Sequence, residues 1–202
     1  MKKSVIITGI LLYTTALLSF SQQPPGKGKF SNFTEGGVLI GNSQDEKKAP
    51  FVFHSSMNYG LSKNLSAGIG VGVEFLRETY LPVTANVMYR FRKDKALFPF
   101  IRFRAGYQVA LESTTTTFDN YYAPSLPTYL NYVPYYPTVD KLNAKGGWML
   151  DPSVGVIVYT RAGLGFSLAA GYRYQKLKYT GENDYIFWAE YNRLLLTFGI
   201  TF

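Results

Sequence analysis

Residues 64–75 have the sequence NLSAGIGVGVEF and decide the fold, because large apolar residues alternate strictly with small or polar ones. A period of two places successive side chains on opposite faces of a β-strand. Leu65, Ile69, Val71 and Phe75 lie on one face, whereas the other face carries mostly glycine and serine. The stretch therefore predicts a strand with one apolar face and one face of small residues.

The same period recurs along the rest of the chain. Residues 163–175 (GLGFSLAAGYRYQ) repeat the design, with Leu164, Phe166 and Leu168 opposite Gly165 and other small residues. Stretches with less regular alternation complete the set. We expect eight strands: Thr34–Gly41, Phe51–Tyr59, Asn64–Phe75, Val83–Arg92, Ile101–Ala110, Trp148–Tyr159, Gly163–Gln175 and Arg193–Phe202.

The composition of the two strand faces indicates which face points outward. In a soluble sandwich the apolar faces pack on one another and the polar faces meet water. Here the second face carries glycine, serine and arginine, which suits the crowded lumen of a narrow closed barrel. The apolar faces have the length that a tilted strand needs to cross a bilayer, and aromatic residues lie near their ends. The sequence predicts an all-β fold, an eight-stranded antiparallel up-and-down transmembrane β-barrel.

The N-terminus has the layout of a secretory signal peptide. Lys2 and Lys3 precede an apolar run from Val5 to Leu18, and a small-large-small triplet ends at Ser21. A membrane anchor is the alternative, but the run is shorter than the ~20 residues that span a bilayer. We therefore expect a signal peptide at residues 1–21, a flexible leader at 22–29 and the barrel at 30–202.

The connections between the expected strands alternate in length. Those at Leu61–Asn64, Lys93–Leu97 and Thr160–Ala162 are short, whereas the longest connection covers about residues 112–146. Short periplasmic turns and longer external loops are typical of outer-membrane barrels. The pattern predicts a protein of a Gram-negative outer membrane with both termini in the periplasm.

Composition excludes several classes of site. The chain has no cysteine and a single histidine, which leaves no disulfide, no thiolate ligand and no histidine cluster, so we expect no metal and no cofactor. The formal net charge is +8, and it stays positive without Lys2 and Lys3. An exported chain rarely meets nucleic acid, so we expect no nucleic-acid partner despite this charge.

Four segments together resemble a known family. They are NYGLSKNLSAGIGVGVEF (58–75), YLPVTANVMYRF (80–91), FPFIRFRAGYQVAL (98–111) and KGGWMLDPSVGVIVYTRAGLGFSLAAGYRYQKLKY (145–179). Their order and pattern resemble the small outer-membrane β-barrel proteins of Bacteroidota. This resemblance implies an outer-membrane location, with outer-membrane lipids and lipopolysaccharide as surroundings, and it implies no single activity. The terminal Phe202 resembles the aromatic signal that the barrel assembly machinery recognises.

The long connection is rich in tyrosine and proline, which makes it a candidate binding surface for a sugar or a protein partner. Tyrosine offers a large amphipathic contact area at low entropic cost, and proline restricts the chain. The alternative is that these side chains pack on the barrel rim or extend the aromatic belt. The tyrosines concerned are Tyr121, Tyr122, Tyr129, Tyr132, Tyr135 and Tyr136.

Many charged residues share the parity of the lumen face. A ring of arginines favours anions, so one hypothesis is a narrow anion-preferring pore. The alternative is a salt-bridged plug, which the size of an eight-stranded interior favours, because that interior is just wide enough for side chains to fill. The residues are Arg90, Arg92, Arg102, Arg104, Arg173 and Arg193, together with Glu35, Glu74 and Asp151.

One group of polar residues suggests catalysis. His54 and Ser56 share lumen parity on one expected strand, and Glu74 shares it on the next. A base beside a carboxylate and a hydroxyl is what acyl transfer needs, and His-x-Ser with a nearby Glu resembles the barrel lipid A deacylases. The alternative is that these residues only satisfy polar contacts near the rim, and we expect no enzymatic activity.

Overall fold

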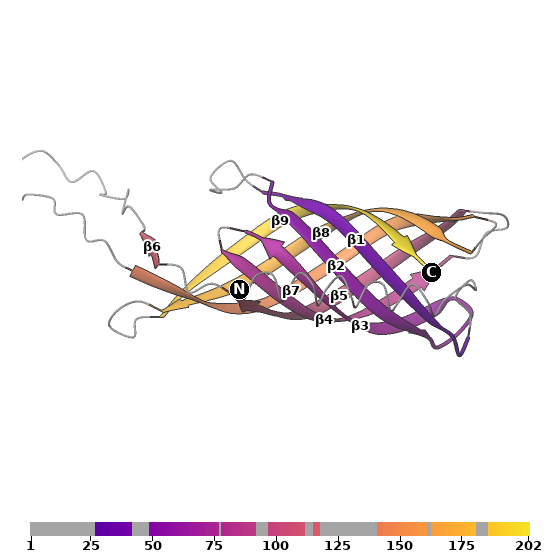
Figure 1. Cartoon of the computed structure of the whole chain (residues 1–202), viewed down its shortest axis with the longest axis horizontal. Helices are drawn as coiled ribbons and strands as arrows, with labels where there is room; N and C mark the ends of the chain where they lie inside the picture. Colours follow the sequence, from indigo (N-terminus) through magenta and orange to yellow (C-terminus); the bar gives the residue numbers. More distant parts are fainter. Residues whose placement is uncertain are drawn as a thin grey trace, which may run out of the picture.

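The computed structural model describes residues 27–41, 49–76, 78–91, 97–111, 115–117, 141–160, 163–180 and 186–202. Within these ranges, eight strands close into an antiparallel barrel in which chain neighbours pair, and β5 pairs with β7 to complete the circle (Figure 1). The ninth strand, β6, adds three residues at the edge of β7. The strands are β1 Phe30–Ile40, β2 Phe51–Gly60, β3 Leu65–Phe75, β4 Thr79–Arg90, β5 Leu97–Ala110, β6 Thr115–Thr117, β7 Lys141–Tyr159, β8 Gly165–Thr180 and β9 Ile186–Thr201.

The closed eight-stranded antiparallel barrel confirms the predicted fold class. The two ends of the barrel differ, and we name them by their connections. At the turn end β1 begins and β9 ends, and tight turns hold Leu61 to Leu65 and Thr160 to Leu164 by backbone hydrogen bonds of 2.9 and 2.7 Å. The opposite end, where β1 finishes at Ile40, is the loop end. No helix in the described ranges is long and apolar enough to cross a membrane.

The strand pairing is staggered, as closure of a barrel requires. Paired residues can be followed once around the wall, and the path that leaves β1 at Leu39 returns to β1 at Lys29. One full circuit of the barrel therefore shifts the pairing register by ten residues. In an eight-stranded barrel a stagger of this kind goes with strands tilted by about 35–45°. The path runs through Leu195, Gly171, Ser153, Arg102, Met88, Ser66 and Gly60.

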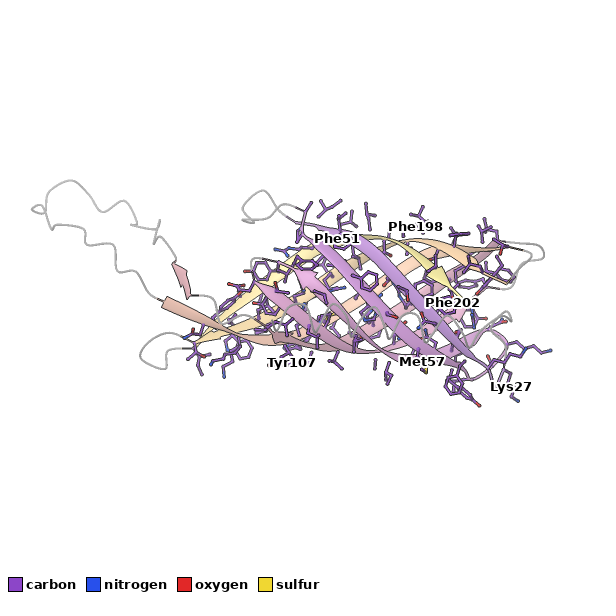
Figure 2. The ribbon with its side chains drawn as sticks, in the orientation of Figure 1. Lys27, Phe51, Met57, Tyr107, Phe198 and Phe202 are labelled. Atoms are coloured by element: carbon purple, nitrogen blue, oxygen red, sulfur yellow. The ribbon has the colours of Figure 1, made fainter. Side chains whose placement is uncertain are left out.

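The outer face of the barrel is apolar. Ile69 and Leu168 expose 72% and 62% of their surface, values that would be costly in water for so many neighbouring apolar residues. In Figure 2 Met57, Tyr107 and Phe198 project away from the wall. The predicted parity of the strands is confirmed, because the residues of the other face, glycines and charged side chains among them, point into the lumen.

Aromatic side chains bracket the apolar face. On β2 the bracket consists of Phe51 and Tyr59, and on β8 it consists of Phe166 and Tyr174. Each pair spans nine residues, which matches the ~9–11 that a tilted strand needs to cross the hydrocarbon core. Phe30 and Tyr59 pack with ring centroids 5.1 Å apart at the turn end, so this aromatic border is continuous across β1 and β2.

Three strands continue beyond the others at the loop end. β7 has 19 residues and β8 and β9 have 16 each, whereas β1 to β4 have between 10 and 12. Figure 1 shows the start of β7 and the short β6 extending past the rest of the barrel. β6 pairs with residues 141–143 of β7, and from Asn143 onward β7 also pairs with β8 on its other side.

The early start of β7 differs from the expected start at Trp148. A β-bulge between Ala144 and Gly146 interrupts the alternation there, so a period of two does not reveal these residues as strand. Gly146 has a φ of 96°, and a Cβ at this position would collide with the carbonyl oxygen of Gln108. Glycine is therefore required where the bulge meets β5.

A charge on the outer face tests whether lipid covers it. Ile69→Arg should lower the free energy of unfolding by about 2–4 kcal/mol, because arginine near the bilayer centre is poorly solvated. The matched change Leu111→Arg, just after β5 at the loop end, should cost only about 0–1 kcal/mol. Urea unfolding in phosphatidylcholine vesicles measures both, and equal costs would contradict a lipid-embedded belt.

Candidate functional site

Six charged side chains from five strands meet inside the barrel, and we call them the ionic layer. Three are carboxylates and three are guanidinium groups, so their formal charges cancel. Each side chain is at most 3% exposed, so all six are buried. The ionic layer consists of Glu35 on β1, Glu74 on β3, Arg102 and Arg104 on β5, Asp151 on β7 and Arg173 on β8.

The six groups form one connected chain of ion pairs. Glu35 binds both Arg104 and, at 3.0 Å, the Nη1 of Arg102. Asp151 lies between two arginines, with its Oδ2 3.6 Å from the Nε of Arg104 and 3.1 Å from the Nη2 of Arg173. The Nη1 of Arg173 then pairs with Glu74 and completes the chain. Every guanidinium group therefore has a carboxylate partner.

Neutral side chains satisfy further atoms of the same carboxylates. Gln108 and Gln175 both donate to the Oε2 of Glu74, the latter at 3.0 Å, and the hydroxyl of Thr197 donates to Glu35 at 3.2 Å. Arg102 in turn donates from Nε to the hydroxyl of Ser153 at 3.2 Å. Charge-assisted bonds of this kind are about twice as strong as neutral ones, and in a dry interior they order the side chains that make them.

Apolar layers bound the ionic layer on both sides. Along β1 the lumen residues run from Phe33 through Glu35 to Leu39, and along β8 they run from Ala169 through Arg173 to Leu177. The turn-end apolar layer consists of Phe33, Met88, Phe100, Ile157 and Ala169. The loop-end apolar layer consists of Leu39, Val52, Leu76, Tyr80, Ala144, Leu177, Tyr179 and Leu195.

Arg102 connects the ionic layer to the turn-end apolar layer. Its guanidinium carbon lies 5.1 Å from the ring centre of Phe33 and 5.8 Å from that of Phe100. These two rings meet edge to face, with centroids 6.0 Å apart. Arg102 therefore makes cation–π contacts with both rings, and a desolvated contact of this kind contributes about 0.5–2 kcal/mol.

The predicted lumen charges divide into two groups. The structure brings Glu35, Glu74, Arg102, Arg104, Asp151 and Arg173 together in the ionic layer and leaves Arg90 and Arg193 outside it. Arg90 is the last residue of β4, at the turn end. Arg193 lies with its guanidinium 4.8 Å from the ring centre of Tyr191. Arg92 falls outside the described residues.

The three candidate catalytic residues do not contact one another in a relay. The Nε2 of His54 lies 2.8 Å from the hydroxyl of Thr84, and Ser56 donates to the carbonyl of Phe33 at 3.4 Å. Glu74 belongs to the ionic layer instead. His54 and Ser56 are each 5% exposed, so an acyl chain in the bilayer has no access to them. This geometry gives the deacylase hypothesis no support.

A second polar cluster at the loop end was not among the predicted residues. The hydroxyl of Tyr80 donates to Glu78 at 3.1 Å and lies 3.2 Å from the hydroxyl of Tyr179, which also bonds Glu78 at 3.4 Å. The expected fourth strand began at Val83 and left Glu78 and Tyr80 in a connection. Tyr80 lies four residues before Thr84, so a period of two extended backwards along β4 would have placed its side chain in the lumen.

Two further predictions concern the ends of the chain and the long connection. β9 ends at Thr201, and the backbone of Phe202 exchanges hydrogen bonds of 2.8 and 3.1 Å with Asn32. Phe202 thus lies where the first and last strands meet.

Six tyrosines of the long connection lie outside the described residues: Tyr121, Tyr122, Tyr129, Tyr132, Tyr135 and Tyr136.

Solved structures of outer-membrane β-barrels share this fold. Neisserial surface protein A superposes with a TM-score of 0.52 at 13% identity, over 85% of this chain and 95% of its own. OprG from Pseudomonas aeruginosa has a TM-score of 0.54 at 9% identity, over 90% and 98%. The outer membrane protein AlkL, solved in lipid bilayers, has a TM-score of 0.52 at 14% identity, over 90% and 92%. No family model and no curated protein matches the chain.

Removal of one carboxylate tests the ionic layer. Glu35→Gln leaves two arginines with less negative charge in a dry interior, so it should lower the free energy of unfolding by about 3–5 kcal/mol. The control Glu190→Gln breaks the exposed pair with Lys176 (2.7 Å) and should cost about 0–1 kcal/mol. Urea midpoints in detergent micelles measure both. Equal and small costs would show that water reaches the lumen charges.

Proposed function

We propose that this chain is an integral outer-membrane barrel with a closed lumen, which serves as a scaffold for a surface-interaction segment at its loop end. The shared fold of outer-membrane barrels supports the location, as do the apolar outer face and its aromatic borders. The two longest connections, residues 41–50 and 111–140, both lie at the loop end, which favours an orientation with both termini in the periplasm. The signal-peptide layout of residues 1–21 agrees with export.

The ionic layer is the observation that carries this proposal. An anion-preferring pore needs arginines that face water and can exchange ions. The guanidinium groups of Arg102, Arg104 and Arg173 are instead paired with carboxylates and at most 2% exposed. Apolar layers on both sides add a second barrier to a hydrated ion. The geometry therefore supports a plug over a pore.

A closed lumen leaves the loop end as the place for an activity. β7, β8 and β9 carry the barrel wall outward there, and β6 and β7 flank the segment 118–140. A strand-supported base holds a binding segment in place and reduces the entropy that a partner must remove on binding. The tyrosines of this segment suit a sugar or a protein partner.

Two further partners belong to this proposal. The outer-membrane lipids, including lipopolysaccharide, surround the apolar face. The barrel assembly machinery recognises the last strand through Phe202, whose pairing with Asn32 places it where the barrel closes. Before the barrel closes, the aromatic C-terminal residue is unpaired, and after closure it is paired with β1. This change suits a signal that is recognised only during assembly.

Planar-bilayer recording tests the closed lumen. The folded wild-type protein should show no reproducible conductance steps, because each arginine of the ionic layer is paired with a carboxylate. Arg102→Ala removes one plug side chain and serves as the comparison. Reproducible anion-selective steps in the wild type that disappear in Arg102→Ala would contradict the plug and establish the pore.

Deletion of part of the long connection tests the surface role. Removal of residues 125–137 should leave a barrel with the heat-dependent gel mobility of folded outer-membrane proteins, because no barrel strand is touched. The same deletion should abolish capture of proteins or glycans that co-purify with the full chain in mild detergent. Loss of folding would refute the binding role and favour rim packing by the tyrosines.

A further inference from the structure

On the outer wall near the loop end, the charged side chains that the structure describes gather in one place. Among the described side chains, the other lysines lie at the turn end. We call the loop-end group the Lys–Trp patch, and it includes both tryptophans of the whole chain. It consists of Lys145 and Trp148 on β7, Lys176 and Lys178 on β8, and Trp188 and Glu190 on β9.

Strand pairing places these residues side by side. Trp148 is opposite Lys176, which is opposite Glu190, and Lys178 is opposite Trp188. The ammonium groups of Lys176 and Lys178 lie 5.6 and 6.0 Å from the ring centre of Trp188. Two lysines two residues apart on one strand face share the same side of the wall. The two ammonium groups of β8 therefore lie close to the same indole ring, that of Trp188 on β9.

The patch carries more positive charge than its own carboxylate neutralises. Glu190 pairs with Lys176 at 2.7 Å. Within the described ranges neither Lys145 nor Lys178 has a carboxylate partner. The patch thus has three cations and one anion, in contrast to the ionic layer inside the barrel, where the charges balance. This excess favours an anionic occupant.

The position of the patch along the barrel indicates the source of that anion. Lys176 follows Tyr174, which marks the loop-end border of the apolar face on β8. Trp148 and Trp188 expose 41% and 46% of their surface, and tryptophan prefers the depth of lipid headgroups. Lysines at that depth attract anionic lipids. A free anion would leave both indole rings in water, whereas a lipid covers them with its apolar part.

We propose that the Lys–Trp patch binds the phosphate group of an anionic membrane lipid in the leaflet at the loop end. Lys178 and Lys145 supply the unpaired positive charge, and Lys176 is held beside them by Glu190. The indole rings contact the part of the lipid between headgroup and acyl chain. This lipid site rests on the proposed function, because it requires a barrel that is inserted in a bilayer.

Tryptophan fluorescence tests the site without a label, because both tryptophans belong to the patch. The folded protein in neutral detergent micelles is titrated with dihexanoyl phosphatidic acid, and dihexanoyl phosphatidylcholine serves as the neutral lipid. We expect a saturable change in emission with phosphatidic acid only. Loss of two cations at the membrane surface should make the K176Q/K178Q variant bind about 30-fold more weakly. The K176R/K178R variant should bind as the wild type does.

The control variant K27Q/K63Q removes two lysines at the turn end and should titrate as the wild type does. Wild-type affinity in K176Q/K178Q, or an equal loss in K27Q/K63Q, would overturn the site. An equal fluorescence response to inorganic phosphate would show a free-anion site and would also overturn a lipid site. Heat-dependent gel mobility confirms folding of each variant. Failure to insert into phosphatidylcholine vesicles would refute the proposed function separately, since that measurement needs no anionic lipid.

Discussion

The need to neutralise charge in a dry interior constrains the rest of this barrel. Leaving one buried charge without its partner costs about 3–5 kcal/mol, a large part of the stability of a small domain. The ionic layer meets this need by linking Glu35, Arg104, Asp151, Arg173 and Glu74 in one chain across five strands. Each link joins different strands, so the ion pairs form only when these five strands are in their observed register.

This constraint also explains the glycines opposite the large lumen side chains. Long arginine side chains fit inside eight strands only where neighbouring positions carry little or nothing. Gly171 lies across from Ser153 and close to the carboxylate of Asp151, and a Cβ there would crowd both residues. The alternation of glycine with charged residues is thus a packing solution for a narrow barrel. Apolar layers at both ends then exclude the water that would weaken the ion pairs.

The sequence alone could predict the strand number, the antiparallel order and the face of each residue, because a period of two is visible within a single strand. It could place Arg102, Arg104 and Asp151 in the lumen for the same reason. It could not pair Arg173 with Glu74, because those residues are joined only by the stagger of closure. The bulge at Gly146 hid the early start of β7. Glu78 was missed since it lies just outside the alternating stretch of β4.

Arginine side-chain NMR measures whether the charge-balanced lumen is closed to water. In the wild-type barrel, labelled with ¹⁵N-arginine in deuterated micelles, the Nε–H signals of Arg102, Arg104 and Arg173 should exchange slowly with water. Point substitutions assign each signal, and an arginine in free solution gives the fast reference rate. Slow exchange at all three sites is the predicted result. Exchange as fast as the free side chain would show a hydrated lumen and contradict the plug.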